Sequence, residues 1–597
     1  MTRLRAWIVA HPEVALVAGI LTAAAVVHAV NMFGCPYFEH DEGHRMSRAW
    51  SVLTAGKLSP YVWTYDETPL SYAQLAGWVL LTGGFHTFGA AIDSGRVFML
   101  VLQVIATGCV YRVARTLSRS MVIGSLAALS FALSPFAVYL HRIVYEDNIA
   151  TFWMLVSLLL LVTGRLSWKR AVLGAIALGL SILSKEPTVF MLPGFACIVQ
   201  CRVDVTRPWR AAVGWAALVA GVVSTWVLYA ALRGELLPSP AGPQHRNTLI
   251  GAALWQLGRA RDGGLLDLSS LFWRTVQIWC RDEPVLVIGG TLGAILCILA
   301  MRWDQVAGRI GLTCFCYWAF LGRGGMVERY YLIDLIPLLA IELALACDLV
   351  VSIVIWYRRW QPALPQWLHE RAIGELLRAL SWLSLVALGH TMLGRFTSLV
   401  CRLLASAGGD DDQSKPSFWR WAAARNPRLL VAASCLAALT VVGYSRPSVN
   451  VPHFDLARDH FLLWHDQQTA GQRAALRWVQ THVPTDSRMV VESFAWTDLH
   501  DGAYQGRVWP HAFPHILAEH NPHIRFDVLH DDWRSIQYVV GGRAVINFAY
   551  RAAHPESIRG RALGTILQRE ALRHATIVAA FDNAAYPVWV FRVDPRS

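Results

Sequence analysis

Long apolar stretches separated by short polar segments run along the chain as far as residue 444. Most have roughly the length that carries a helix across about 30 Å of hydrocarbon, so the pattern predicts membrane-spanning helices. The fold class we expect is a polytopic α-helical membrane protein with about eleven transmembrane helices. The stretches are 8–30, 95–111, 121–140, 148–164, 171–184, 187–200, 211–232, 284–301, 310–321, 331–356 and 428–444.

The pattern changes after residue 446, where no apolar run is long enough to span a membrane and charged, His and Pro residues are frequent. Apolar residues recur at helical spacing over 469–484, and short β-prone runs at 487–494, 536–542 and 586–593 predict strands. These features predict a separate soluble α/β domain at the C-terminus.

Two segments do not fit a simple series of spans. Residues 69–90 are apolar but contain two consecutive glycines, and we expect a helix lying at the outer membrane interface. Residues 381–404 carry His390, Arg395 and Arg402, which are costly inside lipid, and we expect a cytoplasmic amphipathic helix there. The predicted parts are a membrane module (1–356), a cytoplasmic insertion with a polar linker (357–427), a last transmembrane helix (428–445) and an outward-facing soluble domain (446–597).

Composition supports this class and sets the orientation. The chain of 597 residues is 55% hydrophobic and only 16% charged, with a formal net charge of +12. Many of the arginines lie in short gaps between the apolar stretches, where the positive-inside rule accounts for them without nucleic acid as a partner. Alternate gaps therefore lie in the cytoplasm, and the acidic segments 31–91 and 141–147 face outward.

Two pairs of carboxylates meet this outer face. Asp41 and Glu42 lie in the first outer loop, and Glu146 and Asp147 lie at the outer end of a later span. Any one of them could be an ordinary solvated loop charge, but two pairs beside apolar helices favour a functional site. One carboxylate could deprotonate an attacking hydroxyl while another orients the first or binds a metal.

Two cations share this location. Lys185 follows a span on its outer side, and Arg329 begins another. Each could bind the phosphate of an anionic lipid head group, or could simply anchor its helix at the interface.

Five short motifs, taken together and in order, resemble the membrane GT-C glycosyltransferases, with protein O-mannosyltransferases and lipid A aminoarabinose transferases as the closest groups. The resemblance covers roughly residues 1–350 and implies that 1–356 is a catalytic module. Such enzymes take a sugar from a polyprenyl-phosphate carrier and pass it to an acceptor on the exoplasmic face. The motifs are HDEGHR (40–45), YDETPLSYAQLAGW (65–78), SPFAVYLHRIVYEDNIATFW (134–153), SKEPTVFMLP (184–193) and RYYLIDLIPLLAIELA (329–344).

The resemblance implies a role for each matching residue. Asp41 would be the catalytic base of an inverting transfer, with Glu42 beside it and Asp147 as the second acid. Lys185 and Arg329 would hold the leaving phosphate. The other substrate-binding residues would be Arg142, Glu146, Tyr330, Asp66 and Glu67.

One motif departs from the family. Relatives usually carry a His-Pro-Pro or Lys-Pro-Pro element where this chain has Asp66, Glu67, Thr68, Pro69 and Leu70. Carrier binding by that loop is therefore in question, unless a divalent metal such as Mg or Mn, held by Asp41, Asp66 and Glu67, replaces the lost charge.

The C-terminal domain contains a histidine-rich stretch with two nearby aspartates. A metal site is conceivable, but prolines interrupt the spacing that a helix would need, and a polar surface loop is the favoured interpretation. The residues are His511, His515, His520, His523, His530, Asp531 and Asp532.

The expected function is an integral, multi-pass glycosyltransferase of a bacterial plasma membrane. Its partners would be a polyprenyl-phosphate-linked sugar, a protein, lipid or glycan acceptor, and membrane lipids. The alternative is a transporter or flippase-associated protein for lipid-linked sugars, which the lack of a visible inverted repeat disfavours. A third possibility is a non-catalytic scaffold.

Overall fold

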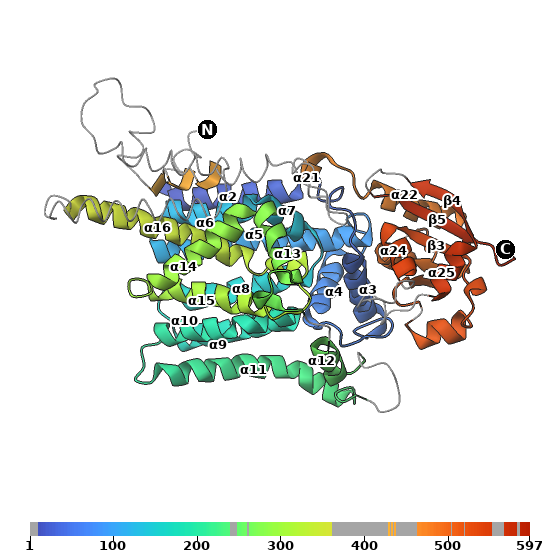
Figure 1. The fold of residues 1–597 in the computed structure, drawn as a ribbon, viewed down its shortest axis with the longest axis horizontal. Coiled ribbons are helices and arrows are strands. Elements are labelled where there is room, and N and C mark those ends of the chain that lie inside the picture. The colour runs from blue at the N-terminus through green and yellow to red at the C-terminus, as the bar shows by residue number, and fades with distance from the viewer. Residues whose placement is uncertain are drawn as a thin grey trace, which may run out of the picture.

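The computed structural model shows a block of helices joined to a C-terminal α/β domain along the longest axis of the molecule (Figure 1). It describes residues 10–238, 247–258, 262–360, 428–437 except 430 and 434, 462–551 except 503 and 519, 566–581 and 586–596. The predictions for 381–404 and the polar linker, and most of that for 428–445, fall outside the described residues.

The predicted apolar stretches are helical wherever the structure describes them. Several are divided by a proline or glycine, as at Ser134–Pro135 between α6 and α7. The helical elements of this part are α2 (Pro12–Ala29), α3 (His40–Ala55), α4 (Leu70–Thr82), α5 (Ala91–Ser118), α6 (Met121–Leu133), α7 (Pro135–Arg142), α8 (Glu146–Val162), α9 (Trp168–Ser184), η1 (Glu186–Met191), α10 (Leu192–Arg202), α11 (Pro208–Leu232), α12 (Leu249–Leu257), η3 (Gly264–Leu266), α13 (Leu271–Asp282), η4 (Val285–Gly290), α14 (Thr291–Leu299), α15 (Gln305–Leu321), η5 (Arg329–Leu332) and α16 (Ile336–Trp360).

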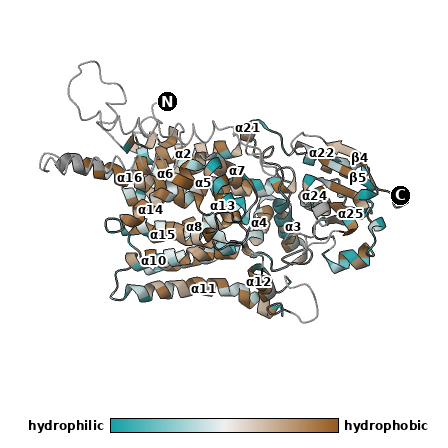
Figure 2. Ribbon diagram, viewed as in Figure 1, coloured by the Kyte–Doolittle hydropathy of each residue, from teal (hydrophilic) through white to brown (hydrophobic). Residues whose placement is uncertain are grey.

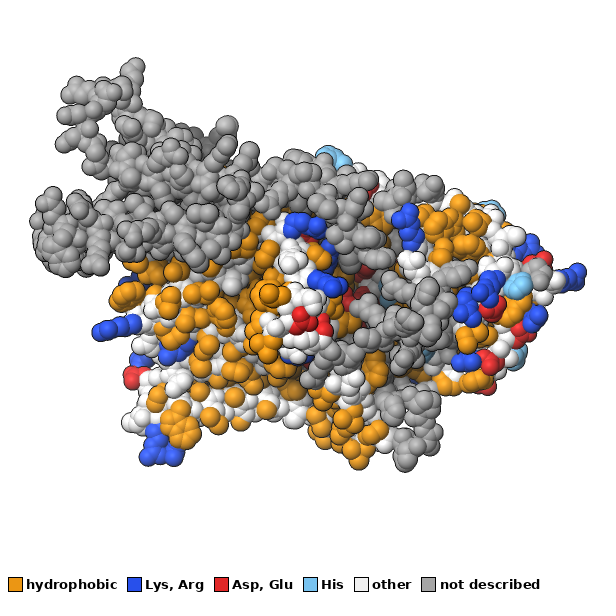
Figure 3. All heavy atoms as spheres, in the orientation of Figure 1, with side chains coloured by type: hydrophobic (Ala, Val, Ile, Leu, Met, Phe, Trp, Pro, Cys, Tyr) orange, Lys and Arg blue, Asp and Glu red, His pale blue; other side chains and the backbone are white. Residues whose placement is uncertain are grey.

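Within the described residues, four helices are long and apolar enough to cross a membrane alone, and two bent pairs bring the number to six. The count of about eleven spans therefore stays a prediction. Apolar residues dominate the helical block (Figure 2), and they cover much of its visible surface, whereas charged side chains gather on the C-terminal domain (Figure 3). Large hydrophobic side chains such as Val213, Leu228 and Leu232 of α11 are exposed, as expected of helices that face lipid.

The segment 40–55, between the first two predicted spans, forms helix α3, for which no helix was predicted. The helix begins after Glu39, whose backbone N–H donates to Glu42 Oε2 over 3.0 Å, so the two glutamates form a capping box. It ends at Gly56, which adopts a left-handed conformation with φ of 62°. Residues 70–82 form helix α4, in agreement with the helix predicted within 69–90, although its relation to a membrane surface stays a prediction.

The C-terminal domain has a five-stranded sheet of order β2-β1-β3-β5-β4. Strand β1 is parallel to β2 and β3, whereas β5 is antiparallel to β3 and β4. The predicted helix and three predicted strands are confirmed as α22, β1, β3 and β5, while β2 and β4 were not predicted. The elements are α21 (Leu462–His465), α22 (Ala470–His482), β1 (Met489–Val491), α23 (Ser493–His500), β2 (Ala512–Pro514), η7 (His523–Val528), η8 (Trp533–Ser535), β3 (Tyr538–Gly542), α24 (Arg543–Arg551), α25 (Ile566–Arg573), β4 (Ala575–Phe581) and β5 (Val588–Val593).

The histidine-rich stretch forms no helix around His511 and His515, because strand β2 lies between them. No group of three His, Cys, Asp or Glu residues in the described parts of the chain could hold a metal ion. Whether this stretch binds a metal stays untested, and the surface-loop interpretation stays a prediction.

Candidate active site

Arg45 is the centre of a buried ion-pair cluster at the end of the helical block. It lies one turn after Asp41 on α3 and its side chain is only 1% exposed. Its guanidinium lies 3.5 Å from Asp41 Oδ2 and 3.5 Å from Glu67 Oε1, and its Nε donates to Glu146 Oε2. Three segments far apart in the sequence thus supply carboxylates to one cation.

Glu146 connects this cluster to a second cation. Lys185 Nζ lies 2.5 Å from Glu146 Oε1 and 3.5 Å from Asp147 Oδ2, and its side chain is 9% exposed. Glu146 begins α8 and Lys185 directly follows α9, so the packing of these two helices brings the pair together. The result is a continuous line of alternating charge from Asp41 to Asp147.

Exposure separates Asp41 from the other members of the cluster. Its side chain is 38% exposed, against 20% for Glu67 and 1% for Glu146. Burial alone would lower the pKa of Arg45, but the carboxylates of Glu146, Glu67 and Asp41 outweigh burial and hold that pKa well above its usual value. Arg45 therefore stays charged, and Asp41 is the carboxylate most open to a reacting hydroxyl.

Two tyrosines lie against the cluster. The rings of Tyr145 and Tyr330 stack with centroids 4.6 Å apart. The Arg45 guanidinium lies 5.4 Å from the Tyr145 centroid, and Lys185 Nζ lies 5.6 Å from that of Tyr330. Such rings stabilise nearby cations.

The structure thus gathers six of the predicted residues, namely Asp41, Glu67, Glu146, Asp147, Lys185 and Tyr330. Asp66 precedes Glu67 in the same turn, where its N–H donates to the carbonyl of Trp63 over 3.2 Å.

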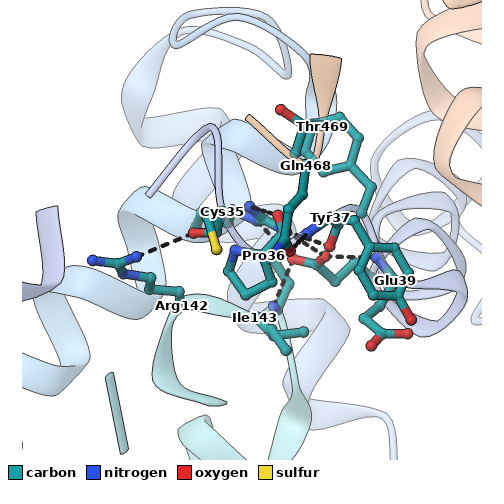
Figure 4. Close-up of polar contacts among 12 residues, drawn as sticks. Cys35, Pro36, Tyr37, Glu39, Arg142, Ile143, Gln468 and Thr469 are labelled. Carbon is teal, nitrogen blue, oxygen red and sulfur yellow. Dashed lines mark hydrogen bonds and ion pairs between the residues drawn. The ribbon is translucent and has the colours of Figure 1, made fainter. Parts of the chain in front are cut away.

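The identified partners of Glu42 and Arg142 are outside the Arg45 cluster. Glu42 is fully buried, and its carboxylate pairs with Arg96 (2.8 Å) and accepts from the N–H of Val144 (3.0 Å). Arg142 donates to backbone carbonyls, among them that of Cys35 over 3.2 Å (Figure 4). Both side chains hold the framework around α3.

The groups identified around Arg329 come from α7 and α13 rather than from the Arg45 cluster. It begins η5, is 9% exposed, and its carbonyl accepts from Trp279 Nε1 over 2.9 Å. Asp282 and Tyr139 are among the charged or titratable groups that act on it.

The proposed metal ligands do not fit a metal site. Asp41 and Glu67 both face the Arg45 guanidinium, which already supplies positive charge between them. No group of three possible ligands is present in the described residues, Asp66 included. We therefore route no chemical step through a metal.

Arg45 and Arg48 were not predicted as site residues. Arg48 is fully buried and donates to Tyr72 Oη (2.8 Å) and to the carbonyl of Trp63 (2.9 Å), thereby holding the 63–67 turn beside α3. The signal was present, because Arg45 follows Asp41 by four residues, the spacing of neighbours on one helix face.

An apolar cavity of about 260 Å³ lies near the charged cluster. Its wall includes Pro69, two residues after Glu67, and Leu183, two residues before Lys185. Helices α3, α4, α9 and α11 contribute the lining, which also includes Val52, Leu58, Leu70, Ala73, Thr225, Trp226 and Tyr229.

Comparison with known proteins agrees with the resemblance found in the motifs. Residues 73–229 match the family described as dolichyl-phosphate-mannose-protein mannosyltransferase. The chain also resembles the crystal structure of ArnT from Cupriavidus metallidurans bound to undecaprenyl phosphate. That likeness has 15% identity and a TM-score of 0.52, and covers 97% of this chain and 98% of ArnT. The chain therefore has the GT-C fold of membrane glycosyltransferases.

Two further structures show weaker likeness. The Archaeoglobus fulgidus oligosaccharyltransferase tethered with an acceptor peptide has 13% identity, covering 95% of this chain and 72% of that one, with a TM-score of 0.44. Arabinofuranosyltransferase AftD from Mycobacteria has 16% identity and a TM-score of 0.43, and the likeness covers 96% of this chain and 40% of AftD. No curated protein matches the chain significantly.

Proposed function

We propose that the protein is an integral membrane glycosyltransferase that moves a sugar from a polyprenyl-phosphate carrier to an acceptor on the exoplasmic face. The observation that carries this proposal is the site itself: a partly exposed carboxylate, Asp41, belongs to a cluster of buried charges, and two members of that cluster, Glu67 and Lys185, lie two residues from the lining of an apolar cavity. A polyprenyl phosphate fits both parts of such a site: its phosphate can bind the cations, and its isoprenoid chain can occupy the apolar cavity.

In the proposed reaction, Asp41 takes the proton from the acceptor hydroxyl while its oxygen attacks the anomeric carbon. The bond from that carbon to the phosphate oxygen breaks, and the phosphate leaves with the electron pair. Attack opposite the leaving group inverts the configuration. Asp41 suits the role of base because it is the most exposed acid of the cluster.

The leaving phosphate needs positive charge rather than a proton. Lys185 is the best-supported cation because it lies beside Glu146 and the Tyr330 ring, within the cluster. Arg329 is the second candidate, at the start of the segment that also carries Tyr330. Glu42 and Arg142 belong to the framework in this proposal, since Glu42 pairs with Arg96 and Arg142 donates to main-chain carbonyls.

The apolar cavity supports a lipid carrier. Its lining is almost entirely hydrocarbon and aromatic, and it lies between helices that also frame the cluster. Isoprene units would bury apolar surface there, and each buried methylene contributes about 0.8 kcal/mol.

The test is turnover by the purified protein in detergent. A panel of polyprenyl-phosphate sugars is supplied with candidate acceptors, and release of free polyprenyl phosphate is followed for wild type and Asp41→Asn. Loss of a general base should lower kcat about 100-fold or more. The control is Asp486→Asn, an exposed aspartate in the C-terminal domain, which should behave as wild type. Tight binding of a lipid-linked sugar without turnover across the panel would refute the proposal in favour of a transporter.

A further inference from the structure

The start of helix α3 is held by the C-terminal domain, more than 400 residues later in the chain. Gln472 of α22 forms a pair of hydrogen bonds with the backbone of Phe38: its Oε1 accepts from the N–H over 2.7 Å, and its Nε2 donates to the carbonyl over 2.8 Å. Gln472 is 4% exposed, so water does not compete for these bonds. Phe38 lies three residues before Asp41.

Two neighbours of Gln472 extend this contact. Gln468 Oε1 accepts from the N–H of Tyr37 over 3.0 Å, and the N–H of Thr469 donates to the carbonyl of Gly34 over 3.1 Å. Figure 4 shows the segment that leads into α3 with Gln468 and Thr469 on one side and Arg142 on the other. The segment is thus fixed between the helical block and the C-terminal domain.

The first turn of α3 also touches helix α23 directly. Ser493 Oγ lies 2.8 Å from His40 Nδ1, the residue before Asp41. A Cβ at Gly43 would lie 2.2 Å from the carbonyl carbon and oxygen of Ser493 and 2.6 Å from the N of Phe494. The two backbones therefore meet at the turn that carries Asp41, and only glycine permits this approach.

A third contact lies beside these two. Arg473, next to Gln472 on α22, makes two hydrogen bonds to Asp93 at the start of α5, with Nη2–Oδ1 at 2.6 Å and Nη1–Oδ2 at 2.8 Å. The C-terminal domain is thereby fixed to two helices of the block, α3 and α5.

From these contacts we propose that Gln472 and Ser493 are positioning residues for Asp41, so that the C-terminal domain forms part of the active site. This inference rests on the proposed function, in which Asp41 is the base. The direction of the Asp41 side chain is set by the backbone of the first turn of α3. Main-chain groups at Tyr37 and Phe38, just ahead of that turn, bond to the C-terminal domain. A displacement of about 1 Å in a catalytic group can lower a rate about 100-fold.

The experiment compares Gln472→Ala, Ser493→Ala and Gly43→Ala with two matched controls. Arg477→Ala changes an exposed residue of the same helix as Gln472. Gly77→Ala adds a methyl group to helix α4 at a position where nothing lies within 4 Å. Each variant is measured for kcat and donor KM, alone and combined with Asp41→Asn, and for hydrogen exchange of residues 33–45 and 70–82 by mass spectrometry.

We expect kcat to fall about 10-fold to 100-fold in the three test variants, with donor KM within about twofold of wild type. Exchange should quicken at 33–45 and stay unchanged at 70–82, which shows that the variant is folded. In the Asp41→Asn background the same substitutions should lower kcat by less than about twofold. The position of residue 41 no longer affects the rate once its carboxylate has been removed. A general loss of stability would instead lower activity equally in both backgrounds.

Any of three results would overturn this inference without affecting the proposed function. They are a wild-type kcat in Gln472→Ala and Gly43→Ala, unchanged hydrogen exchange at 33–45, or a further 10-fold to 100-fold fall of kcat when the substitutions are added to Asp41→Asn. Normal turnover by the Asp41→Asn protein would instead refute the proposed function, so the two failures are distinguishable.

Discussion

Replacing Arg45 by methionine should destabilise the protein strongly. Methionine keeps much of the volume of the side chain but removes the charge that lies between Asp41, Glu67 and Glu146. Arg45 and Glu146 are each only 1% exposed, and removing one partner of such a buried pair typically costs about 3–5 kcal/mol. The pair with Glu67 at 3.5 Å corresponds to about 5 kcal/mol of Coulomb attraction at an effective dielectric constant of 20, before desolvation is subtracted. Asp41 adds less, because it is 38% exposed.

We therefore expect the free energy of unfolding to fall by about 3–5 kcal/mol in Arg45→Met. Chemical denaturation of the purified protein in detergent measures this change. Because the loss comes from uncompensated carboxylates, adding Glu146→Gln to Arg45→Met should restore at least about 1 kcal/mol. The control is Arg302→Met, an exposed arginine outside the cluster, which should change stability by less than about 0.5 kcal/mol.

Two results would refute this reasoning. The first is a stability of Arg45→Met within about 1 kcal/mol of wild type, which would mean that the cluster is well solvated. The second is simple additivity of Arg45→Met and Glu146→Gln, which would mean that the two side chains do not interact.

Two further predictions concern pH and metal ions. Burial, with Asp41 and Glu42 nearby, raises the pKa of Glu39 to about 8 from an ordinary value of 4.5. The fold favours the protonated form, so this contribution to stability is fully present below about pH 4.5 and is lost as the pH rises through about 8. Glu39→Gln should match wild type near pH 4.5 and lose less stability by pH 9 in thermal unfolding, and equal losses in both proteins would contradict the assignment. Chelation by EDTA should leave turnover unchanged, since Asp41 and Glu67 face Arg45, and a loss restored by Mg or Mn would contradict this pairing.

The sequence by itself determined the membrane-embedded helices and much of the C-terminal domain. Backbone groups inside lipid cannot bond to water, and a helix satisfies their hydrogen bonds within one segment. A long apolar stretch in a membrane therefore forms a helix. Periodic apolar residues likewise predicted α22, and β-prone runs predicted β1, β3 and β5. Strands β2 and β4 escaped prediction because β2 (AFP) ends in a proline and lies in no longer β-prone run, and β4 (ATIVAAF) shows no alternation of polar and apolar positions.

The order of the acidic and basic motifs also selected several residues that the structure brings into one ion-pair cluster. Charged residues beside lipid are costly unless they serve a purpose, and this argument selected Asp41, Glu146, Asp147 and Lys185 before any contact was known.

Only the tertiary structure decided which charges pair with which. Glu42 follows Asp41 directly, yet on a helix the two side chains point about 100° apart, and Glu42 binds Arg96 instead of facing the site. The contact of Gln472 with Phe38 joins residues 434 positions apart, and no local pattern encodes such a contact. Local periodicity fixes where a helix forms and which face is apolar, whereas the partner of a buried polar group depends on which elements pack together. The packing of these elements is determined by the sequence of the whole chain.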